Sequence, residues 1–342
     1  MLELPAMSDK VEKKRLAILR VLGEDGGAHG SQEITDRLAA LGHEASERTV
    51  RHHLLALDAD GLTENLGRQG RRITERGTHE LGRARAFDKV GYLAAKIDQL
   101  TYTMDFDLAR RAGTVVVNVS LLERDQLDDA IARMARVFAA RLGVGRLAAL
   151  FAPGERVGAV AVPPGKVGVG TVCSITFNGV LLNHGIPVVS RFGGLLELRG
   201  LKPTRFVELI HYEGTTLDPL EVFIRSGMTD YFGAVETGNG LVGASFREVP
   251  ANSRERVLAI ARQMEEAGLS VVIEVGWPGR PLFDIPVSEG RLGVVVMGGL
   301  NPVAILEETG MRVRHTGAMA GLVDYRSLVP YEELAGRAGR LP

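Results

Sequence analysis

Residues 46–74, SERTVRHHLLALDADGLTENLGRQGRRIT, decide how the N-terminal part of the chain folds. Ser46 is a good helix N-cap, because its hydroxyl can accept a hydrogen bond from the backbone N–H of Thr49. Four apolar residues then recur on one side at helical spacing: Val50, Leu54, Leu55 and Leu57. The pattern predicts a helix that is ended by Gly61.

The opposite side of this helix is polar and basic near its N-terminus. Four of its residues are of the types that a recognition helix uses to contact base edges and phosphates: Arg48, Thr49, Arg51 and His52. Taken alone, the pattern also fits an ordinary amphipathic helix with a solvated charged face. The neighbouring segments favour DNA binding.

A basic hairpin follows the helix. Two short extended segments, Leu62–Leu66 and Arg71–Thr74, are joined by a loop that has a glycine at each end, residues 67–70. Such a hairpin is typical of the wing of a winged helix-turn-helix, which lies along a phosphate backbone or in a minor groove. Its basic residues are Arg68, Arg71 and Arg72.

Two helices are expected before the recognition helix, over Ser8–Leu22 and Ser31–Leu41, and one after the hairpin, from Glu75 to about Phe87. The order helix, helix, helix, hairpin, helix predicts a winged-helix domain over residues 1–87 that binds double-stranded DNA. The alternative is a winged helix that docks another protein.

The composition limits what the remainder can be. The chain has 342 residues, too many for one ordinary core, and 45% are apolar and 24% charged, as in globular proteins. The formal net charge is −1, so DNA binding has to rest on local arginine placement. The single cysteine, Cys173, excludes an intramolecular disulfide and a cysteine-rich zinc site. No stretch has the roughly 18 apolar residues of a membrane span, and we expect a soluble, cytoplasmic protein.

Residues 88–112 are expected to connect this domain to the next. Their apolar residues at helical spacing are Val90, Leu93, Ile97 and Leu100. The helix could carry coupling between the two parts of a regulator, or it could be a plain linker.

Residues 113–342 are predicted to form an α/β effector domain with an internal repeat. VPPGKVGV (162–169) aligns without gaps with VSEGRLGV (287–294), and each copy continues through an apolar helix to a glycine. The copies span about 113–198 and 240–325. The expected elements of the first copy are strands over Gly113–Glu123, Leu147–Phe151, Val157–Val162 and Val167–Val172 and a helix over Asp125–Leu142. Two repeated α/β units would pack about a pseudo-twofold axis with a cleft between them.

Each copy opens its apolar helix through a small polar cluster, CSIT (173–176) or GGLNP (298–302). Asn301 is expected to be an N-cap, and Thr176 occupies the matching position. A third turn, GTT (214–216), precedes a helix that starts at Asp218-Pro219. Helix N-termini attract anions, so these turns are candidate carboxylate or phosphate sites, although each could equally be only a good cap.

Motifs for catalysis or metal binding are absent. The chain has no G-x-x-x-x-G-K-[ST] phosphate loop, no G-x-S-x-G motif and no histidine pair at metal-binding spacing. His52 and His53 are adjacent and point to different helix faces, so they cannot share a metal. The sequence indicates no catalytic residue, no metal site and no enzyme.

Several long segments resemble the NrpR family of nitrogen-regulatory repressors. Among them are VGTVCSITFNGVLLNHGIPV (169–188), RFVELIHYEGTTLDPLEVFIRSGMT (205–229) and IPVSEGRLGVVVMGGLNPVAILEETG (285–310), and the resemblance covers nearly the whole chain. It implies a winged helix followed by one effector domain, repression of nitrogen-assimilation genes by operator binding, and release by 2-oxoglutarate. We expect a homodimer.

A five-carbon dicarboxylate needs two cationic or helix-terminal sites together with hydroxyl or amide donors. Arg191 and Arg247 lie in the matching halves of the repeat and are the first choices, although either could be a structural ion-pair partner. The candidate effector-binding residues are Arg191, Arg247, Thr215, Thr216, Ser174, Thr176 and Asn301. A rival hypothesis is an enzyme or metabolite-binding module whose winged helix only docks a protein.

Overall fold

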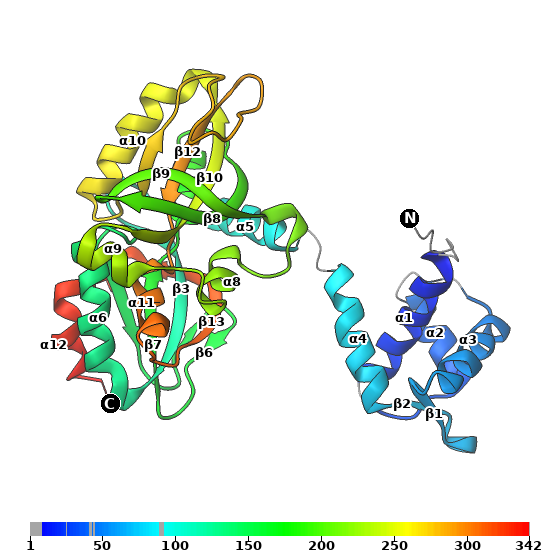
Figure 1. Ribbon diagram of the computed structural model, residues 1–342. Coiled ribbons are helices and arrows are strands. Elements are labelled where there is room, and N and C mark those ends of the chain that lie inside the picture. The colour runs from blue at the N-terminus through cyan, green and yellow to red at the C-terminus, as the bar shows by residue number, and fades with distance from the viewer. Residues whose placement is uncertain (1–8, 25, 41–42, 44, 89–91, 342) are drawn as a thin grey trace. The chain divides into compact units, whose positions relative to one another are not determined.

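The computed structural model describes residues 9–24, 26–40, 43, 45–88 and 92–341. The chain divides into two compact units, Met1–Val90 and Gly91–Pro342 (Figure 1). The helix expected as a connector therefore belongs to the second unit, and Val90, expected on its apolar side, lies outside the described residues. Within the described ranges, no helix is both long enough and apolar enough to cross a membrane.

The first unit has the element order that the sequence predicts, with ends close to the predicted ones. Its elements are α1 (Asp9–Gly23), α2 (Ser31–Ala40), α3 (Glu47–Ala59), β1 (Thr63–Asn65), β2 (Arg71–Ile73) and α4 (Glu75–Asp88). The antiparallel hairpin β1–β2 is closed by a single 3-10 turn, η1 (Gly67–Gln69), and β2 also forms a bridge between Arg71 and His29. The hairpin is thereby fixed to the segment in front of α2.

The core of this unit lies between α1, α2 and α3. Val50, Leu54 and Leu57 of α3 are fully buried against α1 residues such as Leu19. The prediction for Leu55 was wrong, because its side chain is 62% exposed. Successive helical residues point about 100° apart, so a residue directly after the buried Leu54 turns away from the core.

The second unit begins with α5 (Tyr92–Thr103). Its other helices are α6 (Leu127–Ala139), α7 (Ile175–Asn183), α8 (Pro219–Arg225), α9 (Tyr231–Thr237), α10 (Arg254–Glu266), α11 (Asn301–Glu308) and α12 (Leu334–Ala338). Its long strands are β3 (Thr114–Glu123), β4 (Leu147–Phe151), β7 (Lys166–Val172), β8 (Val189–Arg199), β9 (Lys202–His211), β10 (Gly240–Pro250), β11 (Val272–Val275), β12 (Arg291–Met297) and β13 (Arg314–Asp324). The short strands are β5 (Arg156–Val157), β6 (Val160–Ala161) and β14 (Val329–Pro330).

The long strands form two antiparallel five-stranded sheets, β13-β3-β7-β4-β14 and β11-β12-β10-β8-β9. In chain order, β3, β4 and β7 of the first sheet match β10, β11 and β12 of the second. The strand that follows each set crosses over: β8 pairs with β10 of the other sheet, and β13 pairs with β3. Each half of the unit therefore contributes a strand to the sheet of the other half.

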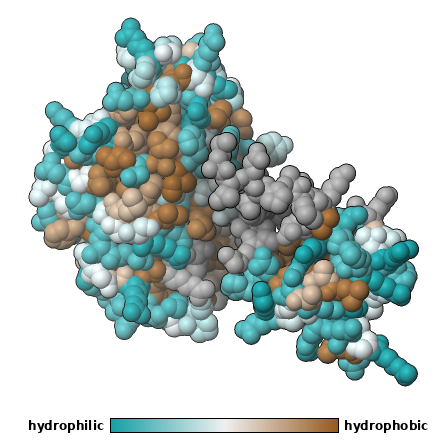
Figure 2. Space-filling view, turned by 45° about the vertical axis from the view of Figure 1, so that its right-hand side comes forward, coloured by the Kyte–Doolittle hydropathy of each residue, from teal (hydrophilic) through white to brown (hydrophobic). Residues whose placement is uncertain are grey.

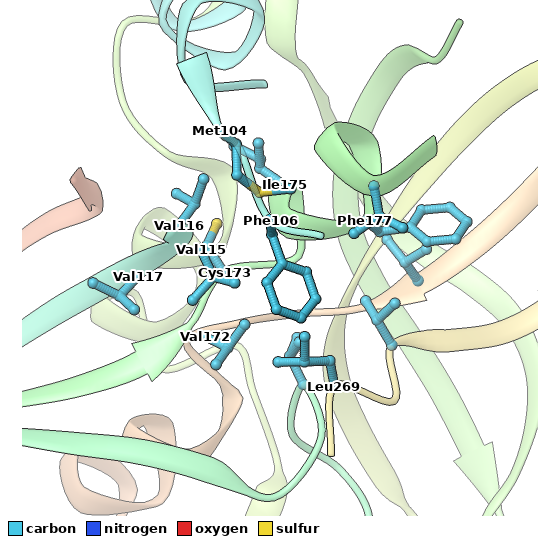
Figure 3. Packing of buried hydrophobic residues seen from close by; sticks show 14 of the residues in the cluster. Met104, Phe106, Val115, Val116, Val117, Val172, Cys173, Ile175, Phe177 and Leu269 are labelled. Carbon is cyan, nitrogen blue, oxygen red and sulfur yellow. The ribbon is translucent and has the colours of Figure 1, made fainter. Parts of the chain in front are cut away.

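The apolar strand faces and helices enclose two hydrophobic clusters. In the first cluster, Phe106 packs among Val172, Ile175 and Leu269, beside the end of β7 where Cys173 lies (Figure 3). On the face of the molecule that Figure 2 shows, apolar patches lie among hydrophilic residues. The second cluster lies around α6, α9 and α11. α5 packs on α7 and β13.

The single strand expected over Val157–Val162 is instead the small hairpin β5–β6. Gly158 lies at its turn with φ +55°, and a Cβ atom there would come within 2.3 Å of the carbonyl oxygen of Ala320. The positive φ and this close approach both require glycine, so the apolar run bends back on itself rather than continuing.

Candidate functional site

The first unit presents its polar α3 side to solvent. Ser46 caps the helix as predicted, with its Oγ 3.2 Å from the backbone N of Thr49. Arg48 and His52 are exposed, whereas His53 is buried, so the two histidines do point to different faces. No described carboxylate lies within 4 Å of Arg48, which leaves its guanidinium free to meet a phosphate or a base. The Thr49 hydroxyl is 2.9 Å from the Ser46 hydroxyl and is only partly exposed.

Arg51 is held along the helix by an intramolecular network. Its Nη2 donates to Glu47 at 2.6 Å and its Nε to the Ser31 hydroxyl at 3.0 Å. The hydrogen bond from Ser31 lowers the pKa of Glu47, and the Arg51 charge adds to this effect. Because the pair is at the surface, its net contribution is small, and Arg51 can exchange it for a base or phosphate contact.

The wing places its three arginines differently. Arg68 lies exposed in η1 at the tip, and Arg72 forms an exposed cross-strand pair with Glu64 at 2.6 and 2.9 Å. Arg71 is turned inward, where its Nε is 2.8 Å from Asp58 of α3. The expectation that Arg71 contacts DNA is not supported by this geometry. Neighbouring residues of a strand face opposite sides, so only one of Arg71 and Arg72 can point away from α3.

The second unit contains a small internal cavity of about 20 Å³ between elements of both halves. Its polar lining includes Asn118 of β3, Ser245 and Arg247 of β10, and Ser174 in the turn before α7. The turn before α11 contributes Gly299. This volume holds about one water molecule.

Arg247 is the most unusual of these residues, because its side chain is only 1% exposed. Its Nη2 donates to the Ser174 hydroxyl at 2.8 Å, whereas Nε and Nη1 are buried without a hydrogen-bond partner. Burial lowers the pKa of this guanidinium. No carboxylate of the described chain lies within 4 Å of it. Leaving a buried charge and its N–H donors unpaired is costly, which makes Arg247 a candidate partner for a bound anion.

Other donors face the same cavity. The amide oxygen of Asn118 accepts from the backbone N of Met319 at 2.9 Å, and its Nδ2 is buried without a partner. The hydroxyls of Tyr212 and Ser245 are 2.8 Å apart. Burial raises the pKa of Tyr212 and raises that of the Cys173 thiol to about 11, so both groups stay protonated. The cavity wall therefore carries several uncharged donors and the Arg247 cation, together with the Asp218 carboxyl group.

Two further charged groups belong to this region: Asp218, which lines the cavity, and Lys96, whose neighbour Ile97 lines it. The Asp218 carboxylate caps α8 by accepting from the backbone N of Leu220 and Glu221, at 2.9 and 3.2 Å. The carboxyl group is buried although part of the residue is accessible, and burial raises its pKa to about 6. Lys96 of α5 is half-buried and donates to the carbonyl oxygen of Ala318 at 3.2 Å.

Of the seven predicted effector residues, Arg247 and Ser174 meet at the cavity. Arg191 does not reach it, because it pairs with the buried Glu248 at 2.8 Å and donates to Ser288 at 3.0 Å. Thr215 forms a local turn with Leu217 ahead of α8, and Thr216 is partly exposed in the same turn. Arg191 therefore has the structural ion-pair role that the sequence left open.

Thr176 and Asn301 tie helices to strands. The Thr176 hydroxyl bonds to the backbone of Val116 in β3, and Asn301 Nδ2 donates to Gly243 of β10 at 2.9 Å and to Leu142 at 2.8 Å. The prediction that Asn301 is the N-cap was wrong: Leu300 holds that position and Asn301 is already helical. Instead of capping the helix, its side-chain amide donates to the backbone of β10.

Sequence reasoning missed Asn118, Ser245, Lys96 and Asp218 as members of this region. A signal for two of them was present. Aligning Gly113 with Gly240 places Asn118 opposite Ser245, and both are polar residues inside Val-rich or apolar buried strands. The described residues hold no group of three or more His, Cys, Asp or Glu that could bind a metal ion.

Comparison with known proteins gives matches to both units. Residues 90–330 match the family described as NrpR regulatory domains NRD1 and 2, and residues 16–81 match the Ribonuclease R winged-helix domain. The global nitrogen regulator NrpRI of Methanosarcina mazei is 33% identical over 322 residues, which cover 94% of this chain and 99% of that protein.

Two longer relatives and one solved structure are also similar. The global nitrogen regulators NrpR of Methanococcus maripaludis and Methanocaldococcus jannaschii are 32% and 31% identical over 294 residues, 86% of this chain, and the chain spans about half of their length, 51%. The crystal structure of a nitrogen repressor-like protein from Methanococcus jannaschii matches with a TM-score of 0.58 and 26% identity. That match covers 69% of this chain and 97% of the other.

Proposed function

The chain belongs to the NrpR family of nitrogen regulators, and from this premise we propose that it is a repressor of nitrogen-assimilation genes, which binds operator DNA and is released by 2-oxoglutarate. The observation that carries the effector part is Arg247, a buried guanidinium with two unpartnered N–H groups at a cavity lined by further donors. Such a planar fork of donors matches a carboxylate or a phosphate, and 2-oxoglutarate supplies two carboxylates.

The ligand would bind with one carboxylate at Arg247 and Ser174, where Asn118 Nδ2 supplies another donor. A five-carbon dicarboxylate needs several times the volume of one water, so the present cavity of about 20 Å³ has to widen. We infer that binding changes the packing of the cavity wall. Such a change is what an effector needs in order to favour one state over another.

The DNA-binding part rests on the winged helix. Arg48 and His52 on α3 and Arg68 and Arg72 on the wing are exposed together on one unit, in the roles of base-reading and phosphate-contacting residues. A winged helix reads one half-site, so we expect a homodimer on a palindromic operator. The protein would act in the cytoplasm, where operator DNA and 2-oxoglutarate occur together.

Two measurements on the purified full chain test this proposal. The thermal midpoint should rise with 2-oxoglutarate, because a ligand that binds only the folded state stabilises it, and it should not rise with an uncharged analogue such as the dimethyl ester. An electrophoretic mobility shift on palindromic promoter DNA should show a complex that 2-oxoglutarate dissociates. A protein that shifts no promoter DNA but turns over or binds another metabolite would favour the rival, an enzyme or metabolite-binding module with a protein-docking winged helix.

A further inference from the structure

We propose that Lys96 is the second anchor of the effector site and that it selects dicarboxylates by binding the carboxylate far from Arg247. This inference rests on the proposed function, because it assumes that a 2-oxo acid binds at Arg247. It adds a specificity-determining residue that lies on a different element, α5, and that none of the sequence motifs indicates.

The first observation is that Lys96 is an incompletely satisfied cation. Its ammonium group can donate three hydrogen bonds, and it donates one, to the carbonyl oxygen of Ala318 at 3.2 Å. No carboxylate of a described residue lies within 4 Å of Nζ. The side chain is half-buried, and burial lowers its pKa. A cation in such a place gains from an anionic partner that brings additional acceptors.

The second observation is its position relative to the cavity. The residue after it, Ile97, lines the cavity, and so does Met319, the neighbour of the Ala318 that accepts its hydrogen bond. The Cys173 thiol, also in the lining, is close enough to feel the charges of both Lys96 and Arg247, since each lowers its pKa. Two cations from α5 and β10 therefore lie near one part of the cavity wall.

The third observation concerns the balance of charge. Arg247 and Lys96 supply two positive charges, and Asp218 is the carboxylate whose charge acts on Lys96. The Asp218 carboxylate is engaged by the backbone N–H groups of Leu220 and Glu221. A ligand with a single carboxylate would satisfy Arg247 and leave Lys96 as it is. A dicarboxylate of suitable length would satisfy both.

An anchor on α5 also has a consequence for regulation. α5 is the first described element after residues 89–91, which join it along the chain to the winged-helix unit. A ligand that pulls Lys96 toward Arg247 would shift this helix against α7 and β13, on which it packs. The ligand would thus act on the helix from which the chain leads back to the DNA-binding unit.

The test compares two ligands that differ in one group: 2-oxoglutarate and 2-oxopentanoate, which has the same five-carbon chain without the far carboxylate. Calorimetric titration of the full chain should give wild-type affinities that differ by about tenfold or more, the effect expected for a charge-assisted hydrogen bond. In Lys96→Gln the ratio should fall to near one, because affinity for 2-oxoglutarate drops while affinity for 2-oxopentanoate stays the same. Lys96→Arg should keep most of the preference, and Lys202→Gln, at an exposed position on β9, should keep all of it.

The outcomes separate this inference from the proposed function. If Lys96→Gln keeps the preference for 2-oxoglutarate, or weakens both ligands equally, Lys96 does not read the far carboxylate, although the site at Arg247 stands. If wild-type protein binds neither 2-oxo acid, the proposed function fails and the inference with it. Circular dichroism of each variant establishes that it is folded before it is titrated.

Discussion

Arg247 of β10 and Arg191 of β8 lie on adjacent strands of one sheet, but their surroundings differ. Substituting them should therefore change the stability of the protein in opposite directions. Replacing a buried, unpaired charge by an apolar residue of similar length removes a desolvation cost, so Arg247→Met should stabilise the ligand-free protein by about 1–4 kcal/mol. It should also abolish the thermal shift by 2-oxoglutarate and leave operator binding intact. Such a variant would be a repressor that cannot be induced.

Arg191→Met is the matched control. It leaves the buried Glu248 carboxylate, 2% exposed, with only the backbone N of Ser288 as a remaining partner at 3.0 Å, so the protein should lose stability by about 1–3 kcal/mol while keeping its response to ligand. Differential scanning calorimetry of the two variants measures both changes in stability, the expected increase for Arg247→Met and the expected decrease for Arg191→Met. A destabilised Arg247→Met that still responds to 2-oxoglutarate would contradict the role given to Arg247.

Asp218 predicts how stability depends on pH. Its folded pKa of about 6 lies above the ordinary value of 3.8, so the folded state binds this proton more tightly than the unfolded state does. Stability contributed by the protonated form is therefore complete below about pH 4 and is lost as the pH rises toward 6. Asp218→Asn keeps an oxygen that can cap α8 and never ionises. The midpoint of the variant minus that of the wild type should grow between pH 4 and 6.5, and a constant difference would refute this assignment.

The candidate site could be predicted only in part at the level of single residues. Arg247 and Ser174 could be predicted because they lie near a strand end and a helix start. In the structure their side chains form a hydrogen bond. Arg191 has the same features but does not reach the cavity. Its role is decided by its partner Glu248, a residue of β10 that is brought beside it only by strand pairing. Lys96 had no signal at all, since a lone lysine on an amphipathic helix is indistinguishable from a solvated one.

At the scale of elements, the wing gives a prediction that separates DNA contact from fold support. Arg68→Ala at the exposed tip should reduce the slope of log affinity against log salt by about one unit and leave the thermal midpoint unchanged. Arg71→Ala should leave that slope nearly unchanged and lower the midpoint, because it removes the partner of Asp58 at the base of the hairpin. Fluorescence anisotropy of a labelled operator between 50 and 200 mM salt, roughly the range in which phosphate contacts are resolved, measures the first effect. If Arg71→Ala instead reduced the salt slope and left the thermal midpoint unchanged, Arg71 would be a DNA-contacting residue.

Local elements were predictable for physical reasons that the sheets do not share. The helices of the first unit and the β1–β2 hairpin depend on capping, spacing and glycine, all of which lie within a few residues of each other. The exchange of β8 and β13 between the two sheets depends on partners more than a hundred positions apart in the case of β13 and β3, and no local pattern encodes it. The small hairpin β5–β6 was missed because the backbone that crowds Gly158 belongs to β13.

For the whole molecule, induction requires that the effector and the operator favour different states of one chain. If saturating 2-oxoglutarate weakens operator binding by some factor, thermodynamic linkage requires saturating operator to weaken 2-oxoglutarate binding by the same factor. A factor of ten to a hundred corresponds to about 1.4–2.7 kcal/mol of coupling, which is within the usual range for allosteric proteins. Titrating 2-oxoglutarate into free protein and into the protein–operator complex measures one side, and titrating operator at zero and saturating ligand measures the other. Lys96→Gln tests whether α5 of the second unit carries the signal. If it does, this variant should bind the operator like the wild type, and the factor by which each ligand weakens binding of the other should be smaller in both titrations. Equal affinity for 2-oxoglutarate with and without operator would exclude allosteric release, whatever the effector site proved to bind.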